Sequence, residues 1–253
     1  MCLIIFAYQV HPVYKLIVAA NRDEFLQRPT APAHYWEDQP DILAGRDLEK
    51  MGTWMGVTRT GRFAALTNYR DPKEITEGKR SRGELVADAL KHKGNVKDYM
   101  QSLAGKQDFY PGYNLLAGEG TELYYYSNKG QKLQAVDPGI YGVSNHLLNT
   151  EWQKVQKGKE GMSKIINGEQ DELVGNLLNM LQNADQAPDE LLPNTGVSLE
   201  WERRLSPLFI QSENYGTRSS TVMLMADKAI QYVERVFTKE GVSEQQYKMN
   251  RSK

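Results

Sequence analysis

Apolar runs rich in β-branched and aromatic residues occur in pairs along this chain, and groups of these pairs alternate with pairs of amphipathic segments. The expected strands, in chain order, cover residues 2–8, 16–21, 53–58, 63–68, 114–117, 122–127, 131–136, 140–144, 219–225 and 229–237. The expected helices cover residues 81–94, 95–103, 152–166 and 172–181. Because hairpins and grouped helices take the place of alternating βαβ units, this order favours an α+β layered fold.

Turn and cap residues separate these segments. His11-Pro12 predicts a hairpin between the first two strands, and Gly61 supplies the positive φ of a tight turn between the next two. Asn95 is typical of a helix N-cap. Residues 182–198 predict a long loop, and the chain after Lys239 is polar enough that we expect it to fray.

Composition limits the classes of protein to which the chain can belong. We expect a single domain over residues 1–253 with a polar tail from residue 240, and the formal net charge of −1 argues against nucleic-acid binding by bulk electrostatics. No segment approaches the roughly 20 apolar residues of a membrane span, and the opening apolar run is short for a signal peptide. The single cysteine rules out an internal disulfide and a multi-cysteine zinc site, and it favours a reducing, cytoplasmic location.

The position of that cysteine has a chemical consequence. If Met1 is removed, Cys2 carries both a thiol and a free α-amino group. A thiol has an ordinary pKa of about 8.5, and an α-amino group of about 7.7–8.0 can act as its base near neutral pH. Cys2 would then be a nucleophile and its general base in one residue. The simpler alternative is a small apolar residue that happens to open a strand.

A polar run follows the second expected strand at the end of the hairpin where Cys2 lies. Antiparallel pairing through the His11-Pro12 turn would bring Arg22 and Asp23 close to Cys2. Arg22 could lower the pKa of the thiol, and Asp23 could accept a hydrogen bond from the terminal amine. From spacing alone, a polar loop explains the run equally well.

Several other residues of types that occur in catalytic or binding sites are more simply explained as structural residues when each is considered alone. The four histidines lack metal-ligand spacing, so no metal site is predicted, and no complete nucleotide-binding motif is present. Asn68 would be an ordinary strand-end residue, Asn145 an ordinary turn residue and Trp54 a core residue. Arg218 could pair with any surface carboxylate.

A set of motifs nevertheless occurs in order from the first residues to the last expected strands. The motifs are Cys2, Asn21-Arg22-Asp23-Glu24, Gly45-Arg46-Asp47, Thr53-Trp54-Met55-Gly56, Leu66-Thr67-Asn68-Tyr69-Arg70, Ser81-Arg82-Gly83-Glu84-Leu85, Gly112-Tyr113-Asn114-Leu115, Gly142-Val143-Ser144-Asn145 and Thr217-Arg218-Ser219-Ser220-Thr221. Together they resemble the NRDE family of transport and Golgi organisation proteins. That family in turn resembles the N-terminal-nucleophile hydrolases, especially the choloylglycine hydrolase and penicillin acylase branch. The resemblance implies a four-layer αββα sandwich.

The resemblance also implies roles for individual residues. The implied catalytic residues are Cys2, Arg22, Asp23, Asn68, Asn145 and Arg218, with Asn68 and Asn145 as oxyanion donors. The implied substrate-binding residues are Asn21, Arg46, Trp54 and Arg82. Those acylases space the arginine and aspartate of the second strand further apart than this chain does.

The expected activity is therefore that of a cysteine amidohydrolase, which cleaves the carbon–nitrogen bond of a small acyl-amide through a thioester on Cys2. The expected partner is a small-molecule amide, and no cofactor is required. The alternative is a carrier or trafficking protein of the same fold that binds haem or a lipid, because a shared fold does not establish turnover. The sequence makes no prediction of oligomeric state.

Overall fold

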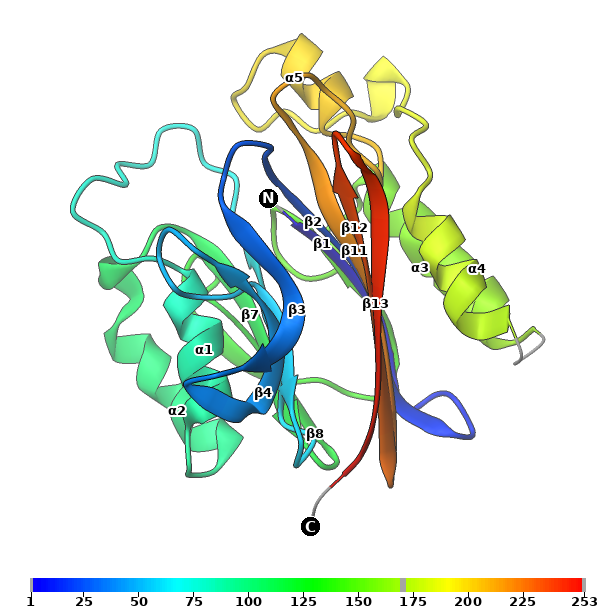
Figure 1. The fold of residues 1–253 in the computed structure, drawn as a ribbon. Helices are drawn as coiled ribbons and strands as arrows, with labels where there is room; N and C mark the ends of the chain where they lie inside the picture. Colours follow the sequence, from blue (N-terminus) through cyan, green and yellow to red (C-terminus); the bar gives the residue numbers. More distant parts are fainter. Residues whose placement is uncertain (1, 169–171, 252–253) are drawn as a thin grey trace.

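The computed structural model describes residues 2–168 and 172–251, and it contains two antiparallel β-sheets packed face to face (Figure 1). The six-stranded sheet has the order β10-β1-β2-β11-β12-β13. Its strands are β10 (Gly139–Val143), β1 (Cys2–Tyr8), β2 (Tyr14–Phe25), β11 (Tyr215–Ala226), β12 (Ala229–Thr238) and β13 (Gly241–Asn250).

The seven-stranded sheet is a meander in which each strand pairs with the next along the chain. Its strands are β3 (Thr30–Trp36), β4 (Gln39–Asp47), β5 (Met55–Thr58), β6 (Phe63–Asn68), β7 (Tyr113–Glu119), β8 (Glu122–Ser127) and β9 (Lys132–Ala135). The segment from β3 to β9 thus forms one sheet, and the two ends of the chain form the other.

Helices cover the outer faces of both sheets, as Figure 1 shows. Helices α1 (Gly83–Lys91) and α2 (Val96–Ser102) pack on the seven-stranded sheet, while α3 (Gln153–Ile166) and α4 (Leu173–Leu181) pack on the six-stranded sheet. The short helix α5 (Leu199–Arg204) follows the long loop after α4. The expected four-layer αββα sandwich is confirmed.

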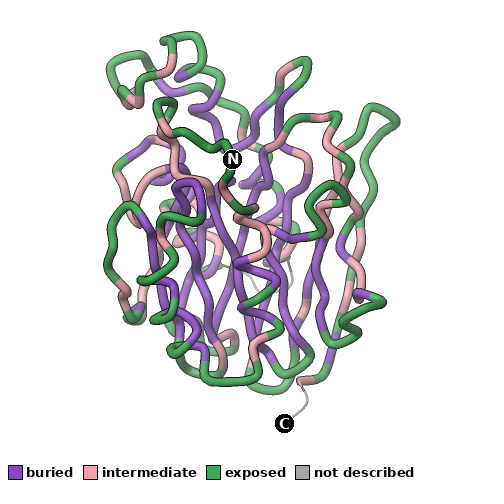
Figure 2. Tube along the Cα trace, turned by 90° about the vertical axis from the view of Figure 1, so that its left-hand side faces the viewer, coloured by how far each residue is buried: buried purple, intermediate pink, exposed green. Residues whose placement is uncertain are grey.

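Side-chain alternation along β1 divides the core between two layers. Ile4 and Phe6 point into the apolar cluster between the two sheets, whereas Leu3 and Ile5 point into the cluster under α3 and α4. This is the period of two expected for a strand that is buried on both faces. Figure 2 shows the result, with central strands buried and the exposed segments gathered in the loops and turns.

Several expected elements are confirmed within a few residues. The first hairpin turns between Tyr8 and Tyr14, and Gly61 has a φ of +89° between β5 and β6. The side chain of Asn95 accepts a hydrogen bond from the backbone nitrogen of Lys97 and caps α2. Among the described residues, no helix has both the length and the apolar character needed to cross a membrane.

Two parts of the sequence-based interpretation were wrong. Strands β3 and β4 were not predicted, because Pro32 interrupts the first and only residues 42–44 form an apolar run in the second. The polar tail from residue 240 does not fray, since most of it forms β13 along β12. Tyr247 donates a hydrogen bond to the backbone oxygen of Ala33 at 2.7 Å and helps to fix this strand.

Candidate active site

Cys2 begins β1, and the strand register brings it beside the polar run of β2. Cys2 pairs directly with Arg22, and Arg22 pairs on its other side with Ser219 of β11. Directly paired residues of antiparallel strands point to the same face, so all three face the space between the two sheets. The expected approach of Arg22 to Cys2 is confirmed by this register. Met1, whose removal the chemistry requires, lies outside the described residues.

A pocket of about 130 Å³ opens beside Cys2. Six of the sequence-predicted site residues line it, namely Cys2, Arg22, Asp23, Trp54, Asn68 and Arg82. Six more lining residues were not predicted, namely Glu24, Arg28, Asp47, Thr53, Leu66 and Gly83. The thiol therefore lies in a small cavity that is rich in charged side chains.

The thiol itself is almost completely buried. Only 8% of Cys2 is exposed, and this burial raises the pKa of the thiol above its ordinary value. The Arg22 guanidinium and a backbone hydrogen bond from Asp23 act in the opposite direction and favour the thiolate. Reactivity at neutral pH therefore depends on the cations and donors that surround Cys2.

The Arg22 guanidinium lies over the Trp54 ring, with its central carbon 4.3 Å from the ring centroid. Its Nη2 atom is 4.0 Å from the Glu24 carboxylate, and only 5% of the Arg22 side chain is exposed. Stacking on a tryptophan and burial both restrict the guanidinium to one position. Trp54 is thus a wall of the pocket that also holds the cation beside Cys2.

Asp23 points to the opposite face of β2, toward the helices. Its Oδ1 atom accepts a hydrogen bond from Thr217 Oγ1 at 2.7 Å, and burial raises the pKa of its carboxyl group. The positive charges of Lys154 and Arg22 partly oppose that rise. Asp23 therefore contacts the Cys2 pocket at the strand edge, while its carboxylate is held from the helix side.

Lys154 of α3 is a buried cation that was not predicted from sequence. Its Nζ atom donates a hydrogen bond to the backbone oxygen of Leu205 at 2.9 Å. Burial lowers the pKa of Lys154 to about 8, and the nearby charges of Asp23 and Cys2 oppose this shift. A lysine on an otherwise apolar helix face was the only sequence signal that could have identified it.

A hydrogen bond joins the two asparagines that were expected at the oxyanion site. Asn68 ends β6 and lines the pocket, and no side-chain hydrogen bond joins it to the other described residues. Asn145 is fully buried, and its Nδ2 atom donates to the backbone oxygen of Asn68 at 3.0 Å. Asn145 thereby fixes the backbone of Asn68, and Asn68 is among the residues that line the pocket.

The backbone of Gly112 joins the pocket residue Arg82 to the chain that follows Asn68. Its oxygen accepts hydrogen bonds from the Tyr69 backbone nitrogen at 2.8 Å and from Arg82 Nη1 at 3.0 Å. Its nitrogen donates to the Glu74 carboxylate at 2.7 Å. A side chain on Gly112 would collide with Lys129 and Tyr69, which makes glycine the residue that fits here. Gly112 thereby sets the positions of Arg82 and of the chain that follows Asn68.

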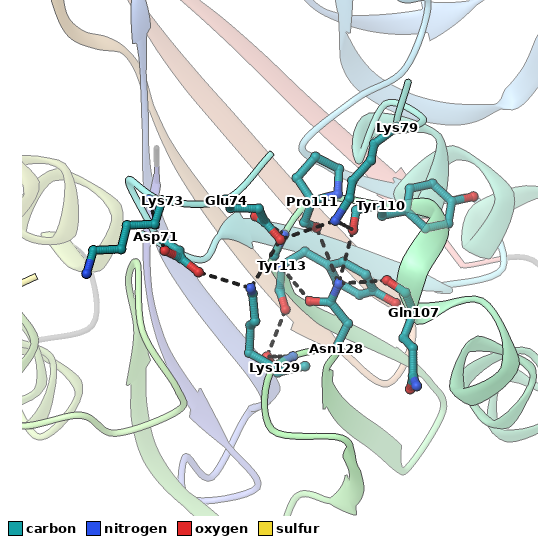
Figure 3. A network of polar contacts seen from close by, with 12 residues as sticks. Asp71, Lys73, Glu74, Lys79, Gln107, Tyr110, Pro111, Tyr113, Asn128 and Lys129 are labelled. Atoms are coloured by element: carbon teal, nitrogen blue, oxygen red, sulfur yellow. Dashed lines mark hydrogen bonds and ion pairs between the residues drawn. The ribbon is translucent and has the colours of Figure 1, made fainter. Parts of the chain in front are cut away.

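A polar network supports Gly112 from outside the pocket (Figure 3). Lys129 lies between Asp71 and Glu74, with Nζ–carboxylate distances of 3.2 Å and 3.1 Å. Asn128 accepts a hydrogen bond from the Tyr113 backbone nitrogen at 2.8 Å and donates to neighbouring backbone oxygens. The network joins the loop after β6 to the start of β7 and the end of β8.

Four of the sequence-predicted site residues are not among those that line the pocket, namely Asn145, described above, and Asn21, Arg46 and Arg218. Asn21 faces the helices and bonds the backbone oxygens of Leu181 and Leu208. The guanidinium of Arg46 pairs with Asp38 and stacks on a tryptophan ring. Arg218 Nη1 donates to the backbone oxygens of Phe25, the last residue of β2, and of Arg28, each at 3.0 Å.

The unpredicted charges on the pocket rim form their own pair. Arg28 Nε donates to the Asp47 carboxylate at 2.8 Å, which joins the segment after β2 to the end of β4. Because β4 was not predicted from sequence, the proximity of these two residues could not be anticipated. Among residues 2–168 and 172–251, no group of three or more histidine, cysteine or acidic side chains could hold a metal ion.

The overall fold resembles that of a known amidase. A solved structure described as a Caenorhabditis elegans N-acylethanolamine-hydrolyzing acid amidase (NAAA) ortholog superposes with a TM-score of 0.51 and 10% sequence identity. The match covers 88% of this chain and 92% of that one. At this identity the likeness shows a shared fold and nothing about the reaction.

Sequence comparison gives a nearer relationship. The chain is 36% identical over 260 residues to the Transport and Golgi organization protein 2 homolog of Bos taurus, and the alignment covers 93% of this chain and 92% of that protein. It is 35% identical to the Homo sapiens homolog with the same coverage. Residues 1–239 match the family described as Transport and Golgi organisation 2. The chain therefore belongs to the Transport and Golgi organisation 2 family.

Proposed function

We propose that this protein is an N-terminal cysteine amidohydrolase that cleaves a small acyl-amide through a thioester on Cys2. One observation carries the proposal: the only thiol of the chain faces a charged pocket of about 130 Å³ and is paired in register with Arg22. A buried thiol without cations and donors around it would be inert.

The reaction begins with activation of the thiol. Once Met1 is removed, the α-amino group of Cys2 takes the thiol proton, and Arg22 stabilises the thiolate. The thiolate attacks the amide carbonyl and forms a carbon–sulfur bond. The ammonium group then returns its proton to the leaving amine as the carbon–nitrogen bond breaks. Water attacks the thioester, releases a carboxylic acid and regenerates the thiol.

The negative charge on the tetrahedral oxygen needs a donor, and we propose that the side chain of Asn68, a residue that lines the pocket, supplies it. Asn145 would act by fixing the Asn68 backbone, since its amide already donates there. A direct role of Asn145 at the oxyanion would require it to give up that hydrogen bond. Loss of one such donor costs on the order of 2.7–4 kcal/mol of transition-state stabilisation.

The pocket also limits the substrate class. Arg22, Arg28 and Arg82 line it, but Glu24 and Asp47 offset part of their charge. Arg28 is already paired with Asp47, so Arg82 is the second cation available to a bound acid group. We therefore propose a small acyl group, with a carboxylate near Arg82 as the favoured anionic feature. The cytoplasmic location expected from the single cysteine stays a prediction.

Intact-mass analysis of the purified protein before and after a reactive β-lactone tests this function. We expect loss of Met1 and a single adduct on Cys2, with no adduct on a Cys2→Ala variant. An Asn68→Ala variant should still lose Met1 but react much more slowly. Retained Met1, or an unreactive Cys2 after processing, would contradict the hydrolase mechanism.

The alternative expectation, haem binding through Cys2, fits this pocket poorly. A volume of about 130 Å³ is below the roughly 300–1,000 Å³ that drug-sized ligands occupy, and haem is at least that large. None of the four histidines is among the described residues that line the pocket. The carrier alternative would be favoured by a Soret band on haem titration that disappears in Cys2→Ala.

A further inference from the structure

A second, smaller cavity lies behind the Arg22 guanidinium. It has a volume of about 20 Å³, and its lining includes Arg22, Trp54, Arg218, Ser219 and Glu234. Three buried polar atoms of these residues have no hydrogen-bond partner of regular geometry, namely Arg22 Nη1, Ser219 Oγ and Glu234 Oε1. Arg22 and Trp54 also line the Cys2 pocket, so the two cavities share a wall.

Strand register explains why these three groups meet. Arg22 of β2 pairs with Ser219 of β11, and Ser219 pairs with Val236 of β12. Glu234 is two residues before Val236, so it points to the same face of the sheet. Figure 1 shows β2, β11 and β12 side by side in this sheet. The face is the one between the two sheets, where a charged carboxyl group is costly unless it has partners.

Glu234 already has one firm contact. Its Oε2 atom accepts a hydrogen bond from the Ala33 backbone nitrogen at 2.5 Å, and the residue has no solvent exposure. The second oxygen, Oε1, has no hydrogen-bond partner of regular geometry, although the Ser219 hydroxyl lies close enough to favour the carboxylate. Burial raises the pKa of this carboxyl group, while Ser219 and Arg22 favour its ionised form.

A buried water needs about 10–15 Å³ and usually makes about three hydrogen bonds. The cavity has that volume, and three unpartnered polar atoms line it. We propose that one ordered water bridges Arg22 Nη1, Ser219 Oγ and Glu234 Oε1, and that Glu234 is a positioning residue that holds the Arg22 guanidinium against Trp54 beside Cys2. The inference rests on the proposed role of Arg22 at the Cys2 thiolate.

Other titratable or charged groups also face Glu234 from the elements packed around it. They are Arg22 on β2, His34 on β3, Arg218 on β11, Tyr232 on β12 and Tyr247 on β13. Arg218 is already engaged by two backbone oxygens. Among the arginines in this set, Arg22 alone has an unpartnered nitrogen at the cavity.

A glutamine at position 234 provides a specific test. The Ala33 nitrogen requires an acceptor at the Oε2 position, so the glutamine NH₂ group would point into the cavity and face the Arg22 donors. Arg22 would then lose its anchor. Removal of the negative charge alone would have the opposite effect on Cys2, since it would make the thiolate easier to form.

The first measurement is a high-resolution crystal structure of the whole protein. We expect density for one water within hydrogen-bond distance of Arg22 Nη1, Ser219 Oγ and Glu234 Oε1. A dry cavity, or a direct ion pair between Arg22 and Glu234, would overturn the inference.

The second measurement is the pH dependence of Cys2 alkylation by iodoacetamide, which reports on the only thiol in the chain. Glu234→Gln and Ser219→Ala should each raise the apparent pKa by about half a unit, which is about threefold in thiolate fraction below the pKa. An unchanged or lowered apparent pKa in both variants would overturn the positioning role. Ser219→Ala changes no charge and keeps the test valid if Glu234→Gln fails to fold.

Two controls separate this inference from the proposed function. Ser220→Ala removes a hydroxyl on the opposite face of the same strand and should leave the alkylation profile unchanged. Arg22→Gln should raise the apparent pKa by more than either cavity variant. If Arg22→Gln has no effect, the proposed role of Arg22 is wrong; if it alone has an effect, only the water-mediated positioning is wrong.

Discussion

Replacement of Asn21 by alanine should destabilise the protein without slowing the chemistry of Cys2. The family resemblance implied that Asn21 binds substrate, but the residue is 1% exposed and faces α4. Its Nδ2 atom donates to the backbone oxygens of Leu181 at 2.9 Å and Leu208 at 2.8 Å. Its Oδ1 atom accepts from Ser220 Oγ at 2.6 Å.

The expected magnitude follows from these three hydrogen bonds. Each contributes about 1 kcal/mol net, and a buried group that loses its partner costs about 1–3 kcal/mol. Asn21→Ala should therefore lower the free energy of unfolding by about 3–5 kcal/mol. For a chain of this size that corresponds to a fall in Tm of about 6–20 °C.

Ser220→Ala is the matched control, because it removes one of the three bonds and should cost about 1 kcal/mol. In the Ser220→Ala variant, Asn21→Ala should lower the free energy of unfolding by about 1 kcal/mol less than it does in the wild type. A double-mutant cycle from urea unfolding would measure this difference. Cys2 alkylation, measured at a temperature at which the variants are folded, should match the wild-type rate. Unchanged stability, or slowed alkylation in the folded variant, would refute this assignment.

Three further outcomes are expected. Arg46→Ala should leave Cys2 alkylation unchanged and cost at most about 1 kcal/mol, since its ion pair and ring contact lie outside the pocket; slower alkylation would contradict this. Glu202→Gln should lower the free energy of unfolding by about 3–5 kcal/mol, because it leaves the buried Arg70 without its partner at 2.7 Å; an unchanged urea midpoint would argue against it. The depressed pKa of Lys154, about 8, means that the unfolded chain binds more protons above that pH. Wild-type stability should therefore rise relative to Lys154→Met between about pH 8 and 10, and parallel stability curves would exclude the effect.

The position of Cys2 beside Arg22 could be predicted from sequence because the first hairpin is local. Two apolar runs and one turn determine its register, and a shift by one residue would send Ile4 and Phe6 to the wrong core. The apolar pattern of the hairpin alone therefore suffices to place Arg22 beside Cys2.

The strands β3, β4 and β13, which help to form the pocket rim and the cavity behind Arg22, could not be predicted in the same way. Pro32 obscures β3, and β13 has few apolar anchors besides Tyr247 and Met249. These strands are held by long-range pairing and by contacts such as that of Glu234 with Ala33, which are 201 residues apart. The salt-bridged rim of the pocket and the cavity behind Arg22 both depend on them, so neither was predicted.

Facing direction explains why adjacent residues of the β2 run differ in role. Asn21 points to the helix layer and holds α4 and the chain near Leu208, whereas Arg22 points between the sheets to the Cys2 pocket. Asp23 turns back toward the helix side, where Thr217 binds its carboxylate. A strand buried on both faces can thus support the outer layer with one residue and serve the site with the next. Proximity in sequence identified the run, but only the register separates its structural residues from those that face the thiol.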